Sequence, residues 1–204
     1  MPETSKTLAG RLVVISGPSG AGKSTVVREL LKAGVCALPL QLSVSATTRK
    51  PRAGEVEGVN YFFLSHDEFA RRRAAGEFLE CKEVFGRGDW YGTLQSQVSS
   101  GLSAGKWVIL EIDVEGAQAV LEQHPDVLTI FLHSGSIDEL ERRLRQRNTE
   151  TEESIRRRLE VARRELAFKD RYRHEVINRD VPTAVREICE ILVRHAKEPP
   201  CSKP

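Results

Sequence analysis

The chain has 204 residues, of which 40% are hydrophobic and 29% are charged. This length suits one α/β domain that buries a sizeable core and has room for small moving insertions. The formal net charge of +2 describes a soluble protein and gives no global electrostatic reason to bind nucleic acid or a membrane, so any affinity for phosphate must come from local clusters.

The cysteines and the N-terminal sequence indicate a cytoplasmic protein. The four cysteines show neither a CxxC spacing nor a metal-binding pattern, which suits a reducing cytosol. The first ten residues, MPETSKTLAG, lack a basic start followed by an apolar stretch, and nowhere do eighteen apolar residues run together. We expect flexible ends at residues 1–9 and 193–204.

A glycine-rich loop follows the first apolar run, Leu12 to Ile15, and leads into a predicted helix. The stretch VVISGPSGAGKST matches GxxxxGK[ST], the phosphate-binding P-loop, whose alternative interpretation is a glycine-rich turn with a chance Lys-Ser pair. Backbone NH groups of such a loop converge on phosphate oxygens, and the helix dipole adds to their field. Lys23 would supply a mobile cation for the phosphates, and the Ser24 hydroxyl could bind Mg²⁺. The predicted triphosphate site comprises Gly17, Pro18, Ser19, Gly20, Ala21, Gly22, Lys23, Ser24 and Thr25.

Short strands and polar loops are predicted from residue 38 to residue 64, because a proline and two glycines interrupt the segment. This looks like a small β insertion. Arg49 and Arg52 flank the rigid Pro51 within it. The pattern is typical either of a solvated basic loop or of a clamp for a second phosphate. In the second case nearby hydroxyls would assist, namely those of Ser45, Thr47 and Tyr61.

Two helices and an acid-ended strand are predicted next. A capping box at Ser65 predicts a helix that ends near Gly76, and a second, polar helix is expected from residue 94 to residue 101. The run KWVILEID, from Lys106 to Asp113, has the form of a buried parallel strand and the position of a Walker B segment. In P-loop enzymes an acid at that strand's end holds Mg²⁺ directly or through water. A surface acid at a strand terminus is the alternative.

The arginine-rich segment after residue 136 predicts a helical hairpin. A helix over residues 114–121 and a strand over residues 127–132 precede it, and a capping box at Ser136 opens it. Asn148 and Thr149 divide the segment into two helices, which could form a lid over a triphosphate. Most of its arginines are expected to lie on solvated helix faces, paired with glutamates at helical spacing. A nucleic-acid arm is the other functional option, which the interspersed acids and the lack of an aromatic platform disfavour.

The last predicted elements are a short strand over residues 175–178 and a final helix. Asp180, with Pro182 just inside, begins that helix, which is expected to run from Thr183 to His195.

Several motifs together resemble guanylate kinase from about Arg11 to Leu192. They are GPSGAGKST, SVSATTRKPRAGEVEGVNYFF, FLE, YGT, ILEID and RRLRQRNT. The resemblance implies an α/β P-loop kinase with a parallel sheet flanked by helices, a small β-rich GMP-binding subdomain at residues 44–97 and a helical lid at residues 136–168. The implied activity is ATP + GMP giving ADP + GDP with Mg²⁺, in guanine nucleotide recycling and biosynthesis. ATP and GMP are then the small-molecule partners; nucleic acid and membrane are not expected, and the oligomeric state is left open.

The resemblance also implies roles for individual residues. Lys23, Arg49, Arg147 and Arg158 correspond to catalytic positions, and Arg143 and Asn178 to further ATP-binding positions, the latter near the adenine. Asp113 corresponds to the acid near Mg²⁺, alongside Ser24. The GMP-binding positions correspond to Ser45, Arg49, Arg52, Tyr61, Glu80, Tyr91 and Thr93, of which Glu80 and Thr93 read guanine.

Three departures from the family pattern are visible. The segment from Arg87 to Trp90 is longer than usual before Tyr91, Asn148 stands where a lid glycine is common, and Arg173-His174 replaces a more acidic and aromatic pattern. None of these changes removes a group that the chemistry needs.

Two rival functions stay open at this point. One is a non-catalytic guanylate-kinase-like module that binds peptides, although this chain keeps both its P-loop and its lid residues. The other is a P-loop kinase for a different small acceptor, since paired arginines fit any phosphorylated acceptor and only Glu80 with Thr93 argues for guanine.

Overall fold

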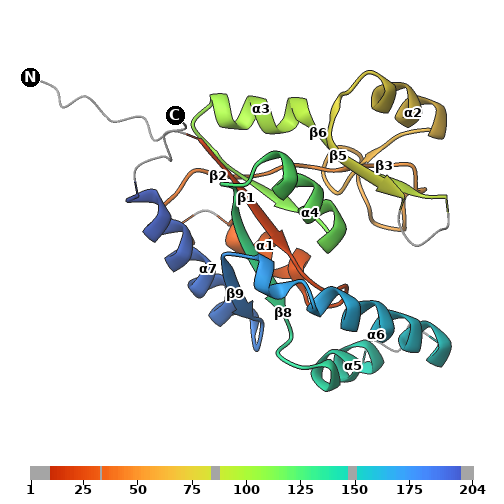
Figure 1. Cartoon of the computed structure of the whole chain (residues 1–204), viewed down its shortest axis with the longest axis vertical. Coiled ribbons are helices and arrows are strands. Elements are labelled where there is room, and N and C mark those ends of the chain that lie inside the picture. Colours follow the sequence, from red (N-terminus) through yellow and green to blue (C-terminus); the bar gives the residue numbers. More distant parts are fainter. Residues whose placement is uncertain (1–9, 33, 84–87, 147–150, 199–204) are drawn as a thin grey trace, which may run out of the picture.

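The computed structural model describes residues 10–32, 34–83, 88–146 and 151–198. A five-stranded parallel sheet forms its centre, in the order β2-β7-β1-β8-β9 (Figure 1). The strands are β1 (Arg11–Ser16), β2 (Leu40–Leu42), β7 (Trp107–Glu111), β8 (Leu128–His133) and β9 (His174–Ile177). Since β1 is central, the loop that follows it emerges at the carboxyl edge of the sheet, where α/β proteins bind their ligands.

Helices cover both faces of this sheet, and the strands are correspondingly apolar throughout. Along β1, Val13 and Ile15 pack on one face with α1 and α7, whereas Val14 packs on the other face with α3 and α4. Such two-sided burial is why continuous apolar runs predict parallel strands. The helices are α1 (Lys23–Leu30), α3 (Gln95–Ser103), α4 (Val114–Gln123) and α7 (Val181–Ala196).

A second, four-stranded sheet lies to one side of the main sheet, in the order β4-β3-β6-β5 (Figure 1). Helix α2 (His66–Ala74) packs on it, and Ser65 caps this helix by accepting a hydrogen bond from the NH of Glu68. Phe69 of α2 stacks on Phe78 at 4.4 Å between ring centroids, which gives this part a small core of its own. The strands are β3 (Ala46–Thr47), β4 (Phe62–Phe63), β5 (Phe78–Glu83) and β6 (Trp90–Leu94).

Two further helices, α5 (Ile137–Gln146) and α6 (Glu152–Leu166), lie beside each other below the sheet (Figure 1). They share a separate apolar cluster that includes Leu140, Leu144 and Leu159. A short 3-10 helix, η1 (Lys169–Arg171), leads from α6 to β9. The predicted break at Asn148 and Thr149 lies outside the described residues, and within these no helix is long and apolar enough to cross a bilayer.

The predicted start of a flexible tail at residue 193 is wrong. Helix α7 continues to Ala196, because Ile191, Leu192 and His195 of its last turns are buried against the sheet. Its start was predicted correctly, since Asp180 caps it by accepting a hydrogen bond from the NH of Thr183 at 2.8 Å, and a proline stands in the first turn.

Candidate active site

The loop between β1 and α1 has the backbone form that binding of phosphate requires. Gly17 has a φ of 140°, and a Cβ placed there would lie 2.0 Å from the carbonyl oxygen of Leu132. Gly22, the residue before α1, has a φ of 90°, and its Cβ would lie 2.6 Å from the side-chain nitrogen of Asn178. Only glycine fits at both positions. The close approach of Leu132 and Asn178 therefore requires the tightly turned backbone of the loop.

Lys23 points back over the loop rather than out to solvent. Its Nζ donates to the carbonyl oxygens of Gly17 at 2.6 Å and Pro18 at 3.1 Å. Burial lowers the pKa of this amine, although Glu165, Glu111 and other nearby charges act on it as well. A partly desolvated cation held against a glycine-rich loop at the start of a helix favours a polyanion as its partner.

The side chain of Asn178 contacts the loop between β1 and α1 and stabilises it. Its side-chain amide is buried and donates to the carbonyl oxygen of Ala21 at 2.7 Å. The backbone oxygen of Asn178 accepts from Nη2 of Arg143 at 2.7 Å, which connects α5 to the same point. The predicted contact of Asn178 with adenine stays a prediction, whereas its contact with the loop was missed because nothing in the sequence links residue 178 to residue 21.

Helix α6 brings one predicted arginine and one unpredicted acid to the loop. Nη2 of Arg158 donates to the hydroxyl of Ser19 at 2.9 Å. The backbone NH of Ser19 donates to Oε2 of Glu165 at 3.3 Å. Burial raises the pKa of Glu165, while Lys23 acts in the opposite direction. Arg147 lies outside the described residues.

Two oxygen-bearing side chains, Ser24 and Glu111, face each other at the start of α1. The hydroxyl of Ser24 donates to Oε1 of Glu111, the last residue of β7, at 2.5 Å. Asp113, the predicted metal residue, is the N-cap of α4, where its Oδ1 accepts from the NH of Gly116 at 2.8 Å. Its other oxygen, Oδ2, lies 2.9 Å from Nζ of Lys82. Hard oxygens of this kind, few in number, suit Mg²⁺ bound largely through substrate phosphates.

Arg49 lies at the centre of a polar cluster in the second sheet. Its Nε donates to the hydroxyl of Tyr91 at 3.0 Å, and its Nη2 lies 2.8 Å from Oε1 of Glu55. The guanidinium carbon is 5.4 Å from the centre of the Tyr61 ring, which itself meets the Tyr91 ring edge-on. Arg49, Tyr61 and Tyr91 are therefore brought together, and the longer segment before Trp90 does not separate Tyr91 from the group.

The other residues of the predicted phosphate clamp are close in the chain but differ in exposure. Arg52 is exposed, and its backbone NH donates to Oε2 of Glu55 at 2.7 Å. Thr47 is buried, and its hydroxyl donates to the carbonyl oxygen of Trp90. The carbonyl oxygen of Ser45 accepts from the NH of Phe62 at 2.9 Å. Glu55, which orders this loop by binding Arg49 and Arg52, was missed by the sequence analysis.

Glu80 and Thr93 form a buried pair on neighbouring strands. Thr93 donates through its hydroxyl to Oε1 of Glu80 at 2.6 Å, and both residues are less than 10% exposed. Burial, opposed by this hydrogen bond, raises the pKa of Glu80 to about 7. Gly116 leaves room for the carboxylate, because a Cβ there would lie 3.1 Å from Oε2 of Glu80. Burying a carboxylate that can still accept further hydrogen bonds costs free energy, and a structural role does not require such a group.

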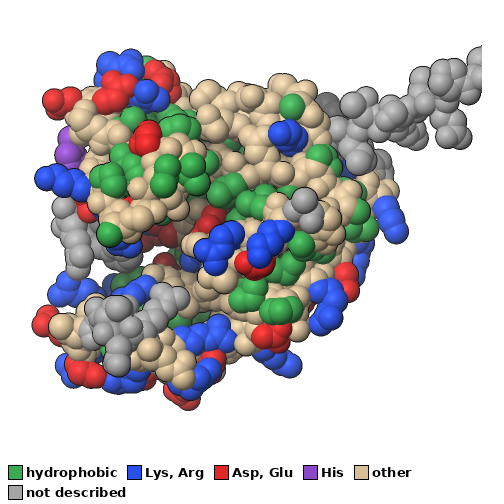
Figure 2. Space-filling model, turned by 180° about the vertical axis from the view of Figure 1, so that it is seen from behind, with side chains coloured by type: hydrophobic (Ala, Val, Ile, Leu, Met, Phe, Trp, Pro, Cys, Tyr) green, Lys and Arg blue, Asp and Glu red, His purple; other side chains and the backbone are tan. Residues whose placement is uncertain are grey.

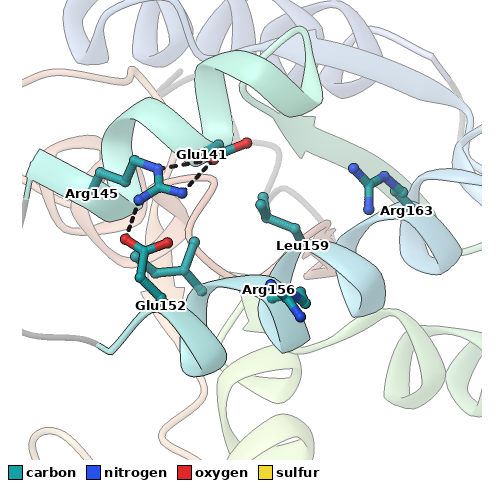
Figure 3. Close-up of a pocket in the computed structure, with 7 residues that line it drawn as sticks. Glu141, Arg145, Glu152, Arg156, Leu159 and Arg163 are labelled. Atoms are coloured by element: carbon teal, nitrogen blue, oxygen red, sulfur yellow. Dashed lines mark hydrogen bonds and ion pairs between the residues drawn. The ribbon is translucent and has the colours of Figure 1, made fainter.

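The surface between the second sheet and helices α5 and α6 is hollowed, and lysine and arginine side chains gather on its lower side (Figure 2). Many other arginines of α5 and α6 are paired along their helices. Arg145 bridges Glu141 of its own helix, at 2.8 Å, and Glu152 of α6, beside a small cavity of about 170 Å³ that Leu159 also lines (Figure 3). These are the glutamate-paired helix faces that the sequence predicted.

A P-loop at the carboxyl edge of a parallel sheet, with α5 and α6 touching that loop and a separate small sheet across the hollow, defines the class of P-loop nucleotide kinases. Sequence comparison narrows this class. The family model described as guanylate kinase matches residues 9–195. A guanylate kinase from Rhodopirellula baltica is 62% identical over 195 residues, covering 95% of this chain and 92% of that protein. One from Clostridium perfringens is 45% identical, covering 95% of this chain and 87% of that protein.

The crystal structure of guanylate kinase from Anaplasma phagocytophilum is similar as well. Its TM-score is 0.76 at 31% identity, with 94% of this chain and 88% of that chain covered. The chain therefore belongs to the guanylate kinase family and is an ATP-dependent kinase that transfers a phosphoryl group to GMP.

Proposed function

We propose that this kinase binds GMP on its second sheet and ATP on its P-loop, and that closure across the hollow between them joins donor and acceptor in line. In this assignment Glu80 and Thr93 read guanine, while Arg49, with Arg52, Tyr61, Tyr91 and Ser45, holds the GMP phosphate. The buried Glu80–Thr93 pair is the observation that carries the proposal. Guanine presents two adjacent donors, N1–H and the exocyclic amine, and a carboxylate is complementary to both.

The acceptor needs no general base, because the phosphate of GMP is already anionic at neutral pH. The difficulty is to bring two polyanions together, so the residues must neutralise charge and fix geometry. We assign that work to Lys23 and Arg158 on the donor side and to Arg49 on the acceptor side. The 2.9 Å contact between Arg158 and Ser19 supports this assignment, since it already brings a lid arginine to the loop. Arg143 and Arg147 are proposed to act from the lid as well.

We also propose that Mg²⁺ accompanies ATP. Ser24 and Glu111 would hold it, with Asp113 close by on the next element, and the oxygen-only donor set of these residues fits the ion. When bound, Mg²⁺ supplies positive charge that stabilises the charge on the phosphoryl oxygens. We assign the enzyme to the cytoplasm, because Cys36, Cys81 and Cys189 are free thiols, as is usual in a reducing compartment.

Calorimetry with GMP and with guanosine tests whether different residues of the acceptor site bind the phosphate and the guanine base. Arg49→Met should weaken GMP binding by roughly two orders of magnitude, because a charge-assisted contact to the phosphate is lost. It should leave the weaker binding of guanosine unchanged, since guanosine has no phosphate. Glu80→Ala should weaken both ligands. Arg71→Met is the matched control, because Arg71 is an exposed arginine of the same subdomain that pairs with Glu68. Wild-type affinity of Arg49→Met for GMP would contradict the assignment.

A further inference from the structure

Two cysteines from opposite ends of the sequence meet on the side of the main sheet that α1 and α7 cover. Cys36 lies in the loop between α1 and β2, and Cys189 lies in α7. The two side chains lie close enough to interact, since Cys36 is among the groups that raise the pKa of Cys189, and Sγ of Cys189 donates to the carbonyl oxygen of Val35, the neighbour of Cys36, at 3.6 Å. Both side chains are half-buried and pack against the core cluster of this face.

The pair lies on an open groove, so a small reagent can reach it. The groove has a volume of about 880 Å³ and is mainly apolar, with Val35, Ala37 and Val185 among its lining residues and Glu190 beside Cys189. Thr25, which the sequence analysis assigned to the triphosphate site, also lines this groove. None of the residues assigned to GMP binding lines it, which separates the cysteine pair from the acceptor site.

We propose that Cys36 and Cys189 are a modification site at which a disulfide oxidant, such as glutathione disulfide, forms an intramolecular disulfide. In the first step the thiolate of Cys36 attacks one sulfur of glutathione disulfide, and one glutathione thiolate leaves and takes up a proton. In the second step Cys189 gives up its proton and attacks the sulfur of Cys36, which releases the second glutathione. Two protein thiols are oxidised, and one glutathione disulfide is reduced to two glutathione thiols.

The order of the two steps follows from the surroundings of Cys189. Burial, the neighbouring Cys36 and the charge of Glu190 raise the pKa of Cys189 to about 12. A thiol in this environment is a poor first nucleophile, because the thiolate is the reactive form. It becomes the resolving thiol once the mixed disulfide on Cys36 holds the electrophilic sulfur beside it.

The disulfide has a predictable consequence for stability. It would join the loop after α1 to the middle of α7 and close a loop that contains most of the chain. Closing a long loop restricts the unfolded chain more than the folded one, so the oxidised protein should melt at a higher temperature.

The test uses the full chain with all its cysteines. Wild type, Cys36→Ser, Cys189→Ser and Cys81→Ser are equilibrated in mixtures of reduced and oxidised glutathione, free thiols are then alkylated, and intact mass is measured without reduction. Trypsin digestion separates the residues of interest into distinct peptides, with Cys36 in residues 33–49, Cys189 in residues 187–194 and Cys81 in residues 74–82. Thermal melting of oxidised and reduced samples follows, and GMP kinase activity in reducing buffer checks that each variant is folded.

Wild type and Cys81→Ser should lose two hydrogens, yield the 33–49 peptide linked to the 187–194 peptide, and melt higher when oxidised. Cys36→Ser and Cys189→Ser should show neither the linked peptide nor the rise in melting temperature. The proposal is overturned if each cysteine instead carries its own glutathione, if another cysteine is the partner, or if oxidation leaves the melting temperature of wild type unchanged or lower.

Discussion

The substitution Glu80→Gln tests two consequences of the buried carboxylate. Its charge lowers the stability of the folded chain, and in the proposed function it binds guanine. Burial raises the pKa of Glu80 from 4.5 to about 7, which corresponds to a cost of about 3 kcal/mol for keeping the carboxylate ionised in the folded chain at pH 8. Glutamine has nearly the same shape and still accepts the hydrogen bond from Thr93, but it carries no charge. The variant should therefore be more stable than wild type at pH 8 in the absence of nucleotides.

The sign of the pH dependence follows from linkage. Because the pKa of Glu80 is higher in the folded than in the unfolded chain, the folded chain holds this proton more tightly. The contribution of Glu80 to the free energy of unfolding is therefore fully present below pH 4.5 and is lost as the pH rises to about 7. Urea unfolding of variant and wild type should give similar stabilities near pH 4.5 and a difference of about 3 kcal/mol at pH 8.

The same variant should lose catalytic efficiency with GMP. A charge-assisted, buried interaction with two guanine donors is replaced by an amide that offers one acceptor and one donor, which should lower kcat/KM for GMP by about two to three orders of magnitude. Efficiency with AMP should not rise. Glu77→Gln, which changes a half-exposed glutamate just before the same strand, should alter neither stability nor efficiency. A Glu80→Gln protein with wild-type stability at pH 8 and wild-type preference for GMP over AMP would refute the reasoning.

Three further predictions follow from the site and from the C-terminal helix. Lys23→Ala should abolish phosphoryl transfer but leave GMP affinity in calorimetry nearly intact, because Nζ of Lys23 is held on the P-loop by two of its carbonyl oxygens; a parallel loss of GMP affinity would count against this. Arg158→Ala should lower kcat far more than it raises the KM for GMP, whereas Arg157→Ala, on the exposed side of the same helix, should do neither; a change in KM alone would show that Arg158 is not catalytic. His174 contacts His195 at 2.8 Å, and burial lowers its pKa below 6.5, so its contribution to stability, present above pH 6.5, is lost as the pH falls through the lowered pKa. His174→Gln should flatten the acid limb of melting temperature against pH, and an unchanged slope would argue that His174 has no part in it.

The sequence predicted the main sheet well because the physical signals there are local. Two-sided burial makes β1 and β8 continuous apolar runs, and side-chain caps at Ser65 and Asp180 fix where helices begin. The P-loop was predictable for the same reason, since its glycines and Lys23 are consecutive. The predicted helix reached His195, one residue short of the observed end of α7, but the flexible tail was predicted to start too early, at residue 193, where the chain is still helical and His195 is buried against His174.

Contacts between distant residues account for what the sequence could not supply. The contact of Glu111 with Ser24 and the capping of α4 by Asp113 depend on how β7 lies beside α1 and α4, so the sequence gives no sign of either. Glu165 and Asn178 contact the P-loop across long stretches of chain, so spacing gives no sign of them. The role of Glu80 and Thr93 in reading guanine was suggested by resemblance alone. The two residues face each other because β5 pairs with β6, and the sequence does not show this pairing.

A coupled ADP-release assay with ATP and, in turn, GMP, AMP, CMP and UMP as acceptor tests directly whether the enzyme is a GMP kinase. ADP release should be rapid with GMP, and kcat/KM for the other three should be lower by roughly 10⁴ or more, since the buried Glu80 would lack the two guanine donors. Comparable rates with GMP and AMP, or no ADP release with any acceptor, would contradict this prediction.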